Sequence, residues 1–375
     1  MKILHLNCNY IDTELHQVMI EKLNRFKLKN IVFVPIDVKR NLRRESSENI
    51  KIVRCFSKWD RLIFWYKQSK IYKQLVTKKI YEEVDLMHAY TLFSDGNCAW
   101  NVYNKYNIPY IVTIRNTDVN IFFKYMIHLR RTGIKIMRDA KFILFLSPSY
   151  KEEVFNKYVP KYLRDTLLSK TFIIPNGIDD FWLKNYPKIE KKTFENRVIK
   201  LIYVGKINKN KNIYSIQKAI KLLINEGWEA SLTMIGKIED KKVFEKLIKD
   251  KNSKYIASQD KENLLNLYRE HDIFIMPSLT ETFGLVYAEA ISQGLPVIYS
   301  KGQGFDKQFE EGVVGFHVNS KSAVEIKDNI LKIIKNYSNI QKNLSDSSKK
   351  FNWNNITSKY HTIYQMLLEE RKGND

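Results

Sequence analysis

Two glutamates and two lysines in the C-terminal half are the side chains whose types and spacing most suggest chemistry. Glu281 and Glu289 lie eight positions apart in ETFGLVYAEA, residues 281–290, and Lys206 and Lys211 follow the apolar run LIYVG. On a single helix the two glutamates would be roughly 12 Å apart. The paired carboxylates of glycosidases lie about 5–9.5 Å apart, so the spacing disfavours an acid–base pair. It favours two ends of one extended ligand.

The loop that carries the lysines has the features of an anion-binding site. A strand is expected to end at Gly205, a polar loop carries Lys206, Lys209 and Lys211, and a helix is expected to begin near Asn212. The N-terminus of a helix presents free N–H groups and a positive dipole, and ammonium groups add point charges. The loop therefore predicts a diphosphate site. The alternative is that the lysines are only solvated.

The stretch between the two glutamates is expected to complete this site. Gly284 marks the predicted start of the helix after the loop PSLTET. The backbone N–H groups of Thr282, Phe283 and Gly284 are expected to face phosphate oxygens. One glutamate is expected to accept hydrogen bonds from a ribose diol and the other from sugar hydroxyls.

Two series of short apolar strands alternate with helical stretches along the chain. Such strands, separated by amphipathic helices, are typical of parallel, doubly wound sheets. The first series is expected at residues 2–7, 30–36, 50–56, 84–90, 109–115, 142–147 and 172–176, and the second at 201–205, 230–236, 273–278 and 296–300. A polar stretch, residues 185–200, is expected to link the two domains. This pattern predicts an α/β protein with a ligand cleft between two domains.

Several catalytic and metal-binding motifs are missing from the sequence. It has no Walker A motif, no three-glycine dinucleotide fingerprint, no G-x-S-x-G elbow and no H-E-x-x-H motif. The three cysteines, Cys8, Cys55 and Cys98, are widely spaced and predict neither a disulfide framework nor a zinc site. Hydrolase and metalloenzyme functions are therefore disfavoured.

The chain is strongly basic, with a formal net charge of +22 at pH 7. This charge favours binding to nucleic acid, an anionic membrane surface or an anionic substrate. The alternative is a lysine-rich composition without a specific partner. The sequence shows no signal peptide and no apolar run of the ~20 residues that a spanning helix needs. We therefore expect a cytoplasmic protein.

The C-terminal half resembles the family-4 glycosyltransferases, which are retaining enzymes of the GT-B fold. The matching segments are LSPSYKEEV (146–154), IIPNGID (173–179), YVGKINKNKN (203–212), LTMIGK (232–237) and MPSLTETFGLVYAEAISQGLPVI (276–298), the last of which contains the E-x7-E pattern. The resemblance implies two Rossmann-like domains that face one another across a cleft. Residues 1–184 would form the acceptor-side domain and residues 185–352 the nucleotide-sugar domain, with a helix at 353–375 packing back on the first.

The resemblance also implies a UDP- or GDP-sugar donor, bound without a metal ion or other cofactor. Lys206 and Lys211 would hold the diphosphate, Glu289 the ribose and Glu281 the donor sugar, although Lys206 stands where the family more often has arginine. Lys206, Lys211 and Glu281 are thus the expected catalytic residues, the lysines stabilising the leaving diphosphate. The full expected donor-binding set is Gly205, Lys206, Lys211, Glu281, Thr282, Phe283, Gly284, Leu285 and Glu289.

The N-terminal half matches the family less closely. Many relatives have a histidine where this chain has Arg115, followed by Asn116 and Asp118. The role of that histidine does not transfer to Arg115, but an arginine can contact phosphate or an anionic acceptor. His88 and Asp95, in MHAYTLFSDG, complete the acceptor-side candidates. The alternative for His88 is a structural histidine.

Residues 38–79 are heavily basic and contain interleaved aromatic side chains, and residues 121–131 form a second candidate of this type. The aromatic residues of the first segment are Trp59, Phe64, Trp65, Tyr66 and Tyr72. Basic and aromatic residues on an amphipathic helix suit an anionic lipid surface, so we expect a peripheral protein at the cytoplasmic membrane face. The alternative is an ordinary helix that buries its aromatic residues in the core.

The predicted function is that of a retaining hexosyltransferase of EC 2.4 type. It would move a sugar from a nucleotide-diphosphate sugar to a saccharide or lipid-linked saccharide in surface polysaccharide or glycolipid assembly. One alternative is a GT-B relative that acts as a phosphorylase or epimerase. The other is a basic nucleic-acid-binding protein without enzymatic activity, although no nucleic-acid-binding module is found and no nucleic acid is expected as a partner.

Overall fold

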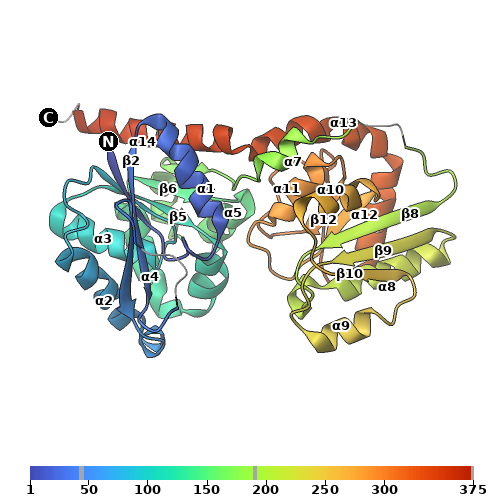
Figure 1. The fold of residues 1–375 in the computed structure, drawn as a ribbon, viewed down its shortest axis with the longest axis horizontal. Helices are drawn as coiled ribbons and strands as arrows, with labels where there is room; N and C mark the ends of the chain where they lie inside the picture. Colours follow the sequence, from blue (N-terminus) through green and yellow to red (C-terminus); the bar gives the residue numbers. More distant parts are fainter. Residues whose placement is uncertain (42–45, 189–191, 373–375) are drawn as a thin grey trace. The chain divides into compact units, whose positions relative to one another are not determined.

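The computed structural model describes residues 1–41, 46–188 and 192–372, which divide into two compact units (Figure 1). Unit 1 comprises Met1–Leu146, Tyr150–Pro175 and the chain from Ile356 onward, and unit 2 comprises Ser147–Ser149 and Asn176–Asn355. The domain boundary at residues 184 and 185 stays a prediction. Parts of three predicted segments lie outside the described residues, namely 42–45 of the basic segment, 189–191 of the linker and 373–375 of the last helix.

Unit 1 contains a seven-stranded parallel sheet in the order β3-β2-β1-β4-β5-β6-β7. Its strands are β1 (Lys2–Leu6), β2 (Lys29–Asp37), β3 (Ile50–Phe56), β4 (Leu86–Ala89), β5 (Tyr110–Ile114), β6 (Phe142–Phe145) and β7 (Thr171–Ile173). Its helices are α1 (Glu14–Leu23), α2 (Phe64–Thr77), α3 (Asp95–Tyr106), α4 (Arg130–Asp139), α5 (Pro148–Lys157) and α6 (Arg164–Leu168). Shorter helical turns are η1 (Asn24–Phe26), η2 (Trp59–Leu62), η3 (Asp118–Phe123), η4 (Ile127–Leu129) and η5 (Lys161–Leu163).

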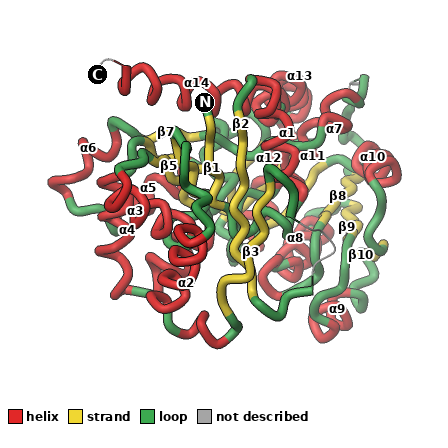
Figure 2. The backbone as a smooth tube through the Cα atoms, turned by 60° about the vertical axis from the view of Figure 1, so that its left-hand side comes forward, coloured by secondary structure: helices red, strands yellow, loops and turns green. Residues whose placement is uncertain are grey.

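The strands of unit 1 are apolar along nearly their whole length, which explains why helices cover the sheet. All residues of β4, β5 and β6 are buried. Strands buried on both faces need helices on both sides, and Figure 2 shows the strands in yellow flanked by helices in red. The strand order reverses between β1 and β4, so the loops that follow these strands diverge and leave room for a ligand at their carboxyl ends.

Unit 2 repeats this plan with a six-stranded parallel sheet in the order β10-β9-β8-β11-β12-β13. Its strands are β8 (Val198–Val204), β9 (Glu229–Ile235), β10 (Ser253–Ile256), β11 (Ile273–Met276), β12 (Val297–Ser300) and β13 (Gly315–Val318). Its helices are α7 (Asp180–Lys184), η6 (Lys209–Lys211), α8 (Ile213–Asn225), α9 (Lys241–Leu247), α10 (Lys261–Arg269), α11 (Leu285–Ser292), α12 (Ala323–Lys335), α13 (Tyr337–Ser348) and η7 (Lys349–Phe351). Here the strand order reverses between β8 and β11, so the loops after these strands are the expected ligand-binding loops.

The structure confirms the predicted strands and adds two that the sequence did not predict, β10 and β13. Both lie at the edges of the sheet of unit 2, and each is only partly buried over four residues. An edge strand has a neighbour on only one side and needs fewer consecutive apolar residues than a central strand, so the sequence indicates it only weakly. The first strand of unit 2 also begins earlier than expected, since β8 starts at Val198 within the predicted linker.

The last helix, α14 (Trp353–Lys372), ends the described chain, and its residues from Ile356 onward belong to unit 1. Two side-chain contacts attach it there. The hydroxyl of Tyr364 lies 2.8 Å from Nδ1 of His88, and the ring of His361 stacks on Phe26 with 4.3 Å between ring centroids. Among the described residues, no helix is both long enough and apolar enough to cross a bilayer.

Candidate donor site and acceptor-side pocket

Two loops of unit 2 are joined beyond the carboxyl ends of β8 and β11. Asn210 in the first loop makes most of the connection, because its carbonyl accepts a hydrogen bond from the N–H of Leu279 at 2.8 Å. Its side-chain amide donates to the carbonyl of Thr280 at 2.9 Å, and its side-chain oxygen accepts from the N–H of Thr280 at 3.1 Å. The Asn212 side chain also donates to the carbonyl of Pro277 at 3.1 Å. These bonds hold Lys211 against the loop that carries Glu281.

Lys211 and Glu281 form an ion pair with 2.6 Å between Nζ and Oε2. Both side chains are largely buried, with exposed fractions of 17% and 10%. The Glu281 carboxylate also accepts hydrogen bonds from the hydroxyl of Ser278 at 3.3 Å and from the N–H of Thr282 at 3.0 Å. The structure therefore brings together the expected diphosphate lysine and the expected sugar-binding carboxylate, which are seventy residues apart in the sequence.

Lys206 has a different environment from Lys211. Its exposed side chain pairs with Glu239 at 2.9 Å, and the Asn208 amide donates to the other oxygen of that carboxylate at 2.6 Å. The hydrogen bond from Lys206 is the main cause that lowers the pKa of Glu239. An exposed pair of this kind contributes little free energy, so Lys206 is held far less firmly than Lys211.

The segment between Glu281 and α11 is shaped by two glycines. Gly284 precedes α11 in the left-handed region, with φ at +74°, and a β-carbon there would collide with the ring of Tyr287. A β-carbon on Gly304 would collide with the carbonyl of Thr282. Next to it, the side-chain oxygen of Gln303 accepts the N–H of Glu281 at 2.9 Å. The prediction that α11 begins at Gly284 is confirmed to within one residue. The supporting loop around Gln303 was not predicted.

The predicted donor-binding amides differ in what they contact. The N–H of Thr282 donates to the carboxylate of Glu281 rather than pointing away from the loop. Phe283 is buried and packs edge-to-face on Phe305 and Phe351, with ring centroids 6.2 and 5.7 Å apart. By helix geometry the N–H groups of Leu285 and Val286, the first of α11, have no acceptor within the helix, whereas the N–H of Tyr287 donates to the carbonyl of Gly284 at 2.9 Å. Free N–H groups at a helix start suit an anion, and the predicted phosphate contacts of this segment stay a prediction.

Glu289 lies on α11, eight residues after Glu281 in the preceding loop, and is partly buried. The hydroxyl of Tyr268 donates to its Oε2 at 3.5 Å. Burial is the main cause that raises the pKa of Glu289 to about 7, while the hydrogen bond from Tyr268 and the charge of Lys261 oppose this rise. This carboxyl group therefore titrates near neutrality, unlike an exposed glutamate.

In unit 1, His88 has the environment of a structural histidine. It is fully buried on β4. Its Nδ1 lies 2.8 Å from the hydroxyl of Tyr364 and its Nε2 lies 2.9 Å from the hydroxyl of Thr113. Burial lowers the pKa of His88 well below its usual value, and the nearby His5 lowers it further. Both ring nitrogens are thus used within the protein, so His88 is placed to support the sheet rather than to contact a ligand.

Asp95 and Asp118 are buried carboxyl groups that accept hydrogen bonds from loops. Asp118 accepts from the N–H groups of Leu92, Phe93 and Arg115 at 3.0–3.1 Å. Asp95, at the start of α3, accepts from the hydroxyl of Thr91 and the N–H of Cys8. Burial raises the pKa of Asp95 to about 7 and that of Asp118 to about 6, against the lowering effect of these hydrogen bonds. These two carboxyl groups fix the loops that follow β1, β4 and β5.

Arg115 and Asn116 are also engaged within unit 1. The guanidinium of Arg115 donates from Nε to the carbonyl of Tyr90 at 2.8 Å and lies 5.8 Å from the centroid of its ring. The side-chain oxygen of Asn116 accepts from the hydroxyl of Tyr150 at 3.2 Å. Both side chains are partly exposed.

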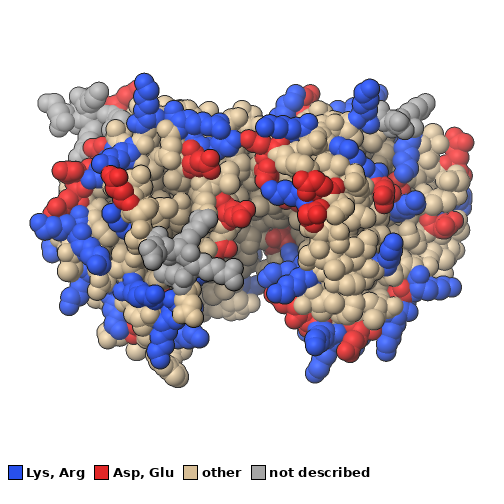
Figure 3. All heavy atoms as spheres, viewed as in Figure 1, with Lys and Arg blue, Asp and Glu red and all other residues tan. Residues whose placement is uncertain are grey.

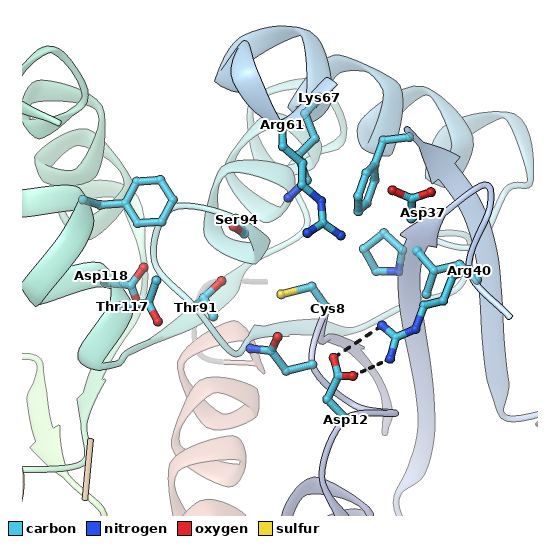
Figure 4. A pocket seen from close by; sticks show the side chains of 15 residues that line it. Cys8, Asp12, Asp37, Arg40, Arg61, Lys67, Thr91, Ser94, Thr117 and Asp118 are labelled. Carbon is cyan, nitrogen blue, oxygen red and sulfur yellow. Dashed lines mark hydrogen bonds and ion pairs between the residues drawn. The ribbon is translucent and has the colours of Figure 1, made fainter. Parts of the chain in front are cut away.

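A pocket of about 270 Å³ opens in unit 1 near the carboxyl ends of β1, β2 and β4 (Figure 4). Of the five predicted acceptor-side residues only Asp118 lines it, while Asp95 lies behind the lining residues Cys8 and Thr91. The pocket is lined by Cys8, Asn9, Asp12, Pro35, Ile36, Asp37, Arg40, Phe56, Arg61, Lys67, Thr91, Ser94, Thr117, Asp118 and Phe122. The basic members, Arg40, Arg61 and Lys67, belong to the segment 38–79, for which the sequence predicted lipid binding but not a pocket.

One group of side chains in unit 2, Asp306, Glu311 and His317, has ligand atoms close enough to hold a metal ion. Its members are already bonded to one another and to the backbone. His317 Nδ1 lies 2.9 Å from Asp306 and 3.2 Å from Glu311, and the N–H of Gly302 donates to the second oxygen of Asp306. The arrangement is that of an internal hydrogen-bonded network at the start of β13.

Two comparisons with known sequences gave matches, one within unit 2 and one over most of the chain. Residues 186–351 match the family described as "Glycosyl transferases group 1". The alpha-monoglucosyldiacylglycerol synthase of Acholeplasma laidlawii is 26% identical over 319 residues, which cover 80% of this chain and 79% of that protein.

Two solved structures share the fold over nearly the whole chain. Sucrose-phosphate synthase from Thermosynechococcus elongatus has a TM-score of 0.74 at 18% identity and covers 99% of this chain and 100% of its own. Anabaena HepE in complex with UDP has a TM-score of 0.72 at 16% identity and covers 98% of this chain and 100% of its own. The predicted fold class, GT-B with two Rossmann-like domains, is confirmed. Together, the sequence and structural similarities support a glycosyltransferase of the GT-B fold.

Proposed function

We propose that the protein is a retaining glycosyltransferase. It transfers a sugar from a nucleotide-diphosphate sugar to a saccharide or lipid-linked saccharide in glycolipid or surface-polysaccharide assembly. The observation that carries this proposal is the ion pair between Lys211 and Glu281, which is held by two loops at the switch point of the sheet of unit 2. This is the position at which a doubly wound domain binds a nucleotide.

The ion pair suits a group that must stabilise a leaving diphosphate. An ammonium group donates up to three hydrogen bonds, so Lys211 can keep Glu281 and still donate to phosphate oxygens. Because Lys211 is largely buried, its charge is less screened than that of an exposed lysine. Positive charge fixed in place before the reaction lowers the barrier as negative charge develops on the leaving group.

The remaining roles follow from the positions of the other residues. The first N–H groups of α11 would face the diphosphate, and Glu289 would accept hydrogen bonds from the ribose diol. Glu281 would orient Lys211 and approach the donor sugar. The acceptor hydroxyl would attack on the face of the leaving group, and a phosphate oxygen would take its proton, which retains the anomeric configuration. In this reaction no metal ion or other cofactor is required.

The names of similar proteins support the choice of substrates. HepE was solved in complex with UDP, and the relative from Acholeplasma laidlawii is named for the synthesis of a glycolipid. We therefore propose a uridine-diphosphate sugar as the first donor to test and place the enzyme at the cytoplasmic membrane face.

A thermal-shift screen against UDP- and GDP-sugars tests the donor. A ligand that binds only the folded protein raises Tm according to its concentration over Kd. We expect one nucleotide class to raise Tm and the Lys211→Ala variant to lose the shift. Lys209→Ala is the matched control, since Lys209 is an exposed lysine of the same loop. The absence of a shift with every nucleotide sugar would contradict the proposal.

A further inference from the structure

Two short segments of unit 1 contain half of the exposed large hydrophobic side chains of the described residues. The first spans η2 and the start of α2, and the second spans η3 and η4. We call these side chains the apolar patch; they are Trp59, Leu62, Ile63, Trp65, Tyr66, Ile121, Tyr125 and Ile127. Trp59 and Leu62 are 79% and 78% exposed, and Trp65 and Tyr66 are exposed as well. Phe64 and Tyr72, by contrast, pack against the core, so the alternative of a helix that buries its aromatic residues holds for only two of the five. Exposed apolar clusters of this kind mark a surface that contacts another partner.

The two segments of the apolar patch meet through their partly buried aromatic rings. Phe64 on α2 packs edge-to-face against Phe122 on η3, with 5.9 Å between ring centroids. Phe122 in turn stacks on Phe93 at 4.7 Å. Phe122 also lines the pocket of unit 1, so the ring that joins the two segments of the apolar patch is also part of the pocket wall.

Basic residues accompany the apolar patch in both segments. Lys58 precedes η2 and Lys124 lies between η3 and η4, and both are exposed. Figure 3 shows many Lys and Arg side chains on the visible face of unit 1. Apolar side chains with basic residues beside them fit the interface of a membrane with anionic lipids.

The pocket next to the apolar patch contains two basic groups that pair with no carboxylate of the described residues. Arg61 and Lys67 come from η2 and α2, and Figure 4 shows both side chains directed towards the space above Cys8. Within the described part of the chain, neither forms an ion pair. Their charged ends lie 5.6 and 4.6 Å from the centroid of the Phe56 ring. Arg40, by contrast, is neutralised by its ion pair with Asp12. The pocket therefore offers two positive charges to a ligand, beside the carboxyl groups of Asp37 and Asp118 that also line it.

The same pocket contains a carboxylate oxygen that lacks a donor. Asp37 is 5% exposed, and its Oδ1 accepts the N–H of Lys39 at 3.0 Å. Its Oδ2 is buried without a hydrogen-bond partner among the described residues. A buried polar atom without a partner costs about 1–3 kcal/mol, which a hydroxyl group of a bound ligand can offset. An anionic group and a hydroxyl on one small ligand would satisfy all three side chains.

We propose that this pocket binds the anionic, hydroxyl-bearing head group of a lipid acceptor while the apolar patch rests in the membrane interface. This inference rests on the proposed function, because it assigns the acceptor of that reaction. The volume of about 270 Å³ lies just below the ~300–1,000 Å³ of pockets for drug-sized ligands, which favours a head group over a long saccharide. The shared ring of Phe122 favours a lipid over a soluble phosphate, since a soluble ligand needs no apolar surface beside it.

Vesicle flotation with the full chain tests the proposal. Phosphatidylcholine vesicles would contain either phosphatidylglycerol, whose head group carries hydroxyls, or phosphatidylethanol, which has the same charge and no hydroxyl. We expect at least about threefold tighter binding to phosphatidylglycerol, and we expect Asp37→Asn to remove this preference. Equal binding of the unmodified protein to both lipids would overturn the pocket assignment.

Matched variants distinguish the contributions of the apolar patch and of the pocket to vesicle binding from a general effect of positive charge. Replacing Leu62 and Trp65 with serine should abolish flotation, whereas Tyr162→Ser should not, because Tyr162 is 82% exposed in unit 1 but lies outside the apolar patch. Lys67→Gln should weaken binding to phosphatidylglycerol vesicles more than Lys73→Gln, which removes the same charge from an exposed position on α2. Equal losses for the two lysine variants would overturn the role of the pocket.

Two further measurements separate this inference from the proposed function. Stabilisation by soluble glycerol 3-phosphate without any flotation would overturn the lipid assignment and point to a soluble acceptor. The shift in Tm that UDP causes is measured with the same protein samples. If UDP binds and vesicles do not, the inference fails and the proposed donor site stands; if vesicles bind and UDP does not, the proposed function fails.

Discussion

The two loops of unit 2 that hold Lys211 and Glu281 and the pocket of unit 1 both place positive charge at the carboxyl ends of parallel strands. Among the described residues, the charge is paired with a carboxylate in unit 2 and unpaired in unit 1. In unit 2, Lys211 is already paired with Glu281 and fixed by the bonds that Asn210 makes. In unit 1, Arg61 and Lys67 have no carboxylate partner among the described residues. A group that acts in a reaction benefits from being held in place beforehand, whereas a group that binds a charged ligand is compensated by that ligand. We therefore expect changes in unit 2 to reduce turnover and changes in unit 1 to reduce acceptor binding.

The largest effect is expected for Lys211→Ala. Loss of a fixed cation at the leaving group should lower kcat by about 10²–10³-fold. Steady-state donor turnover measures this, with Lys209→Ala as the control that keeps an unchanged kcat. A near-normal kcat in Lys211→Ala would place the charge stabilisation elsewhere.

A smaller effect is expected from the two glutamates, and it should differ between them. Glu281→Ala should mainly lower kcat, because Lys211 loses the partner that orients it. Glu289→Ala should mainly raise the KM for the donor, by about 10- to 150-fold, because a charged hydrogen bond contributes roughly 1.5–3 kcal/mol. Kinetics of both variants with the same donor decide this. The opposite pattern would mean that the two ends of the donor are assigned in reverse.

The pH dependence of donor binding should follow Glu289. Since burial raises its pKa to about 7, the group is protonated below pH 7 and charged above it. A charged carboxylate accepts hydrogen bonds more strongly, so the Kd of UDP should fall by a few-fold as the pH rises from 6 to 8. Calorimetry at both pH values measures this. Glu289→Gln has no titrating carboxyl group and corrects for the titration of UDP itself; an equal slope in this variant would exclude Glu289.

The smallest effect is expected for Lys206→Ala, although the sequence placed Lys206 and Lys211 in the same role. Lys206 is exposed and paired with the exposed Glu239, and such pairs contribute about 0–1 kcal/mol. The donor KM should therefore change no more than about fivefold. A loss of activity as large as that of Lys211→Ala would show that Lys206 leaves Glu239 when the donor binds.

The sequence predicted most of the fold because the central strands of both sheets are continuous apolar runs. It missed β10 and β13, where the apolar signal falls at the sheet edges. In the donor site, local features were predictable, such as the start of α11 after Gly284. The contact between Lys211 and Glu281 was not, because it depends on how loops seventy residues apart meet.

The acceptor side was harder to predict for the same physical reason. The residue type of His88 suggests chemistry, but only its burial and its two hydrogen bonds show that its ring nitrogens are occupied within unit 1. The unpaired oxygen of Asp37 could not be predicted from the sequence. The neighbouring residues do not show whether both oxygens of a buried aspartate accept hydrogen bonds. The exposure of Trp59 likewise depends on tertiary packing.

The anomeric configuration of the released or transferred sugar tests the retaining mechanism most directly. Proton NMR can follow the enzyme as it turns over the nucleotide sugar that stabilises it most, before the product anomers interconvert. Attack on the leaving-group face predicts that an α-linked donor first gives an α-configured product, and that Lys211→Ala slows its formation. A β-configured first product would contradict the proposed mechanism.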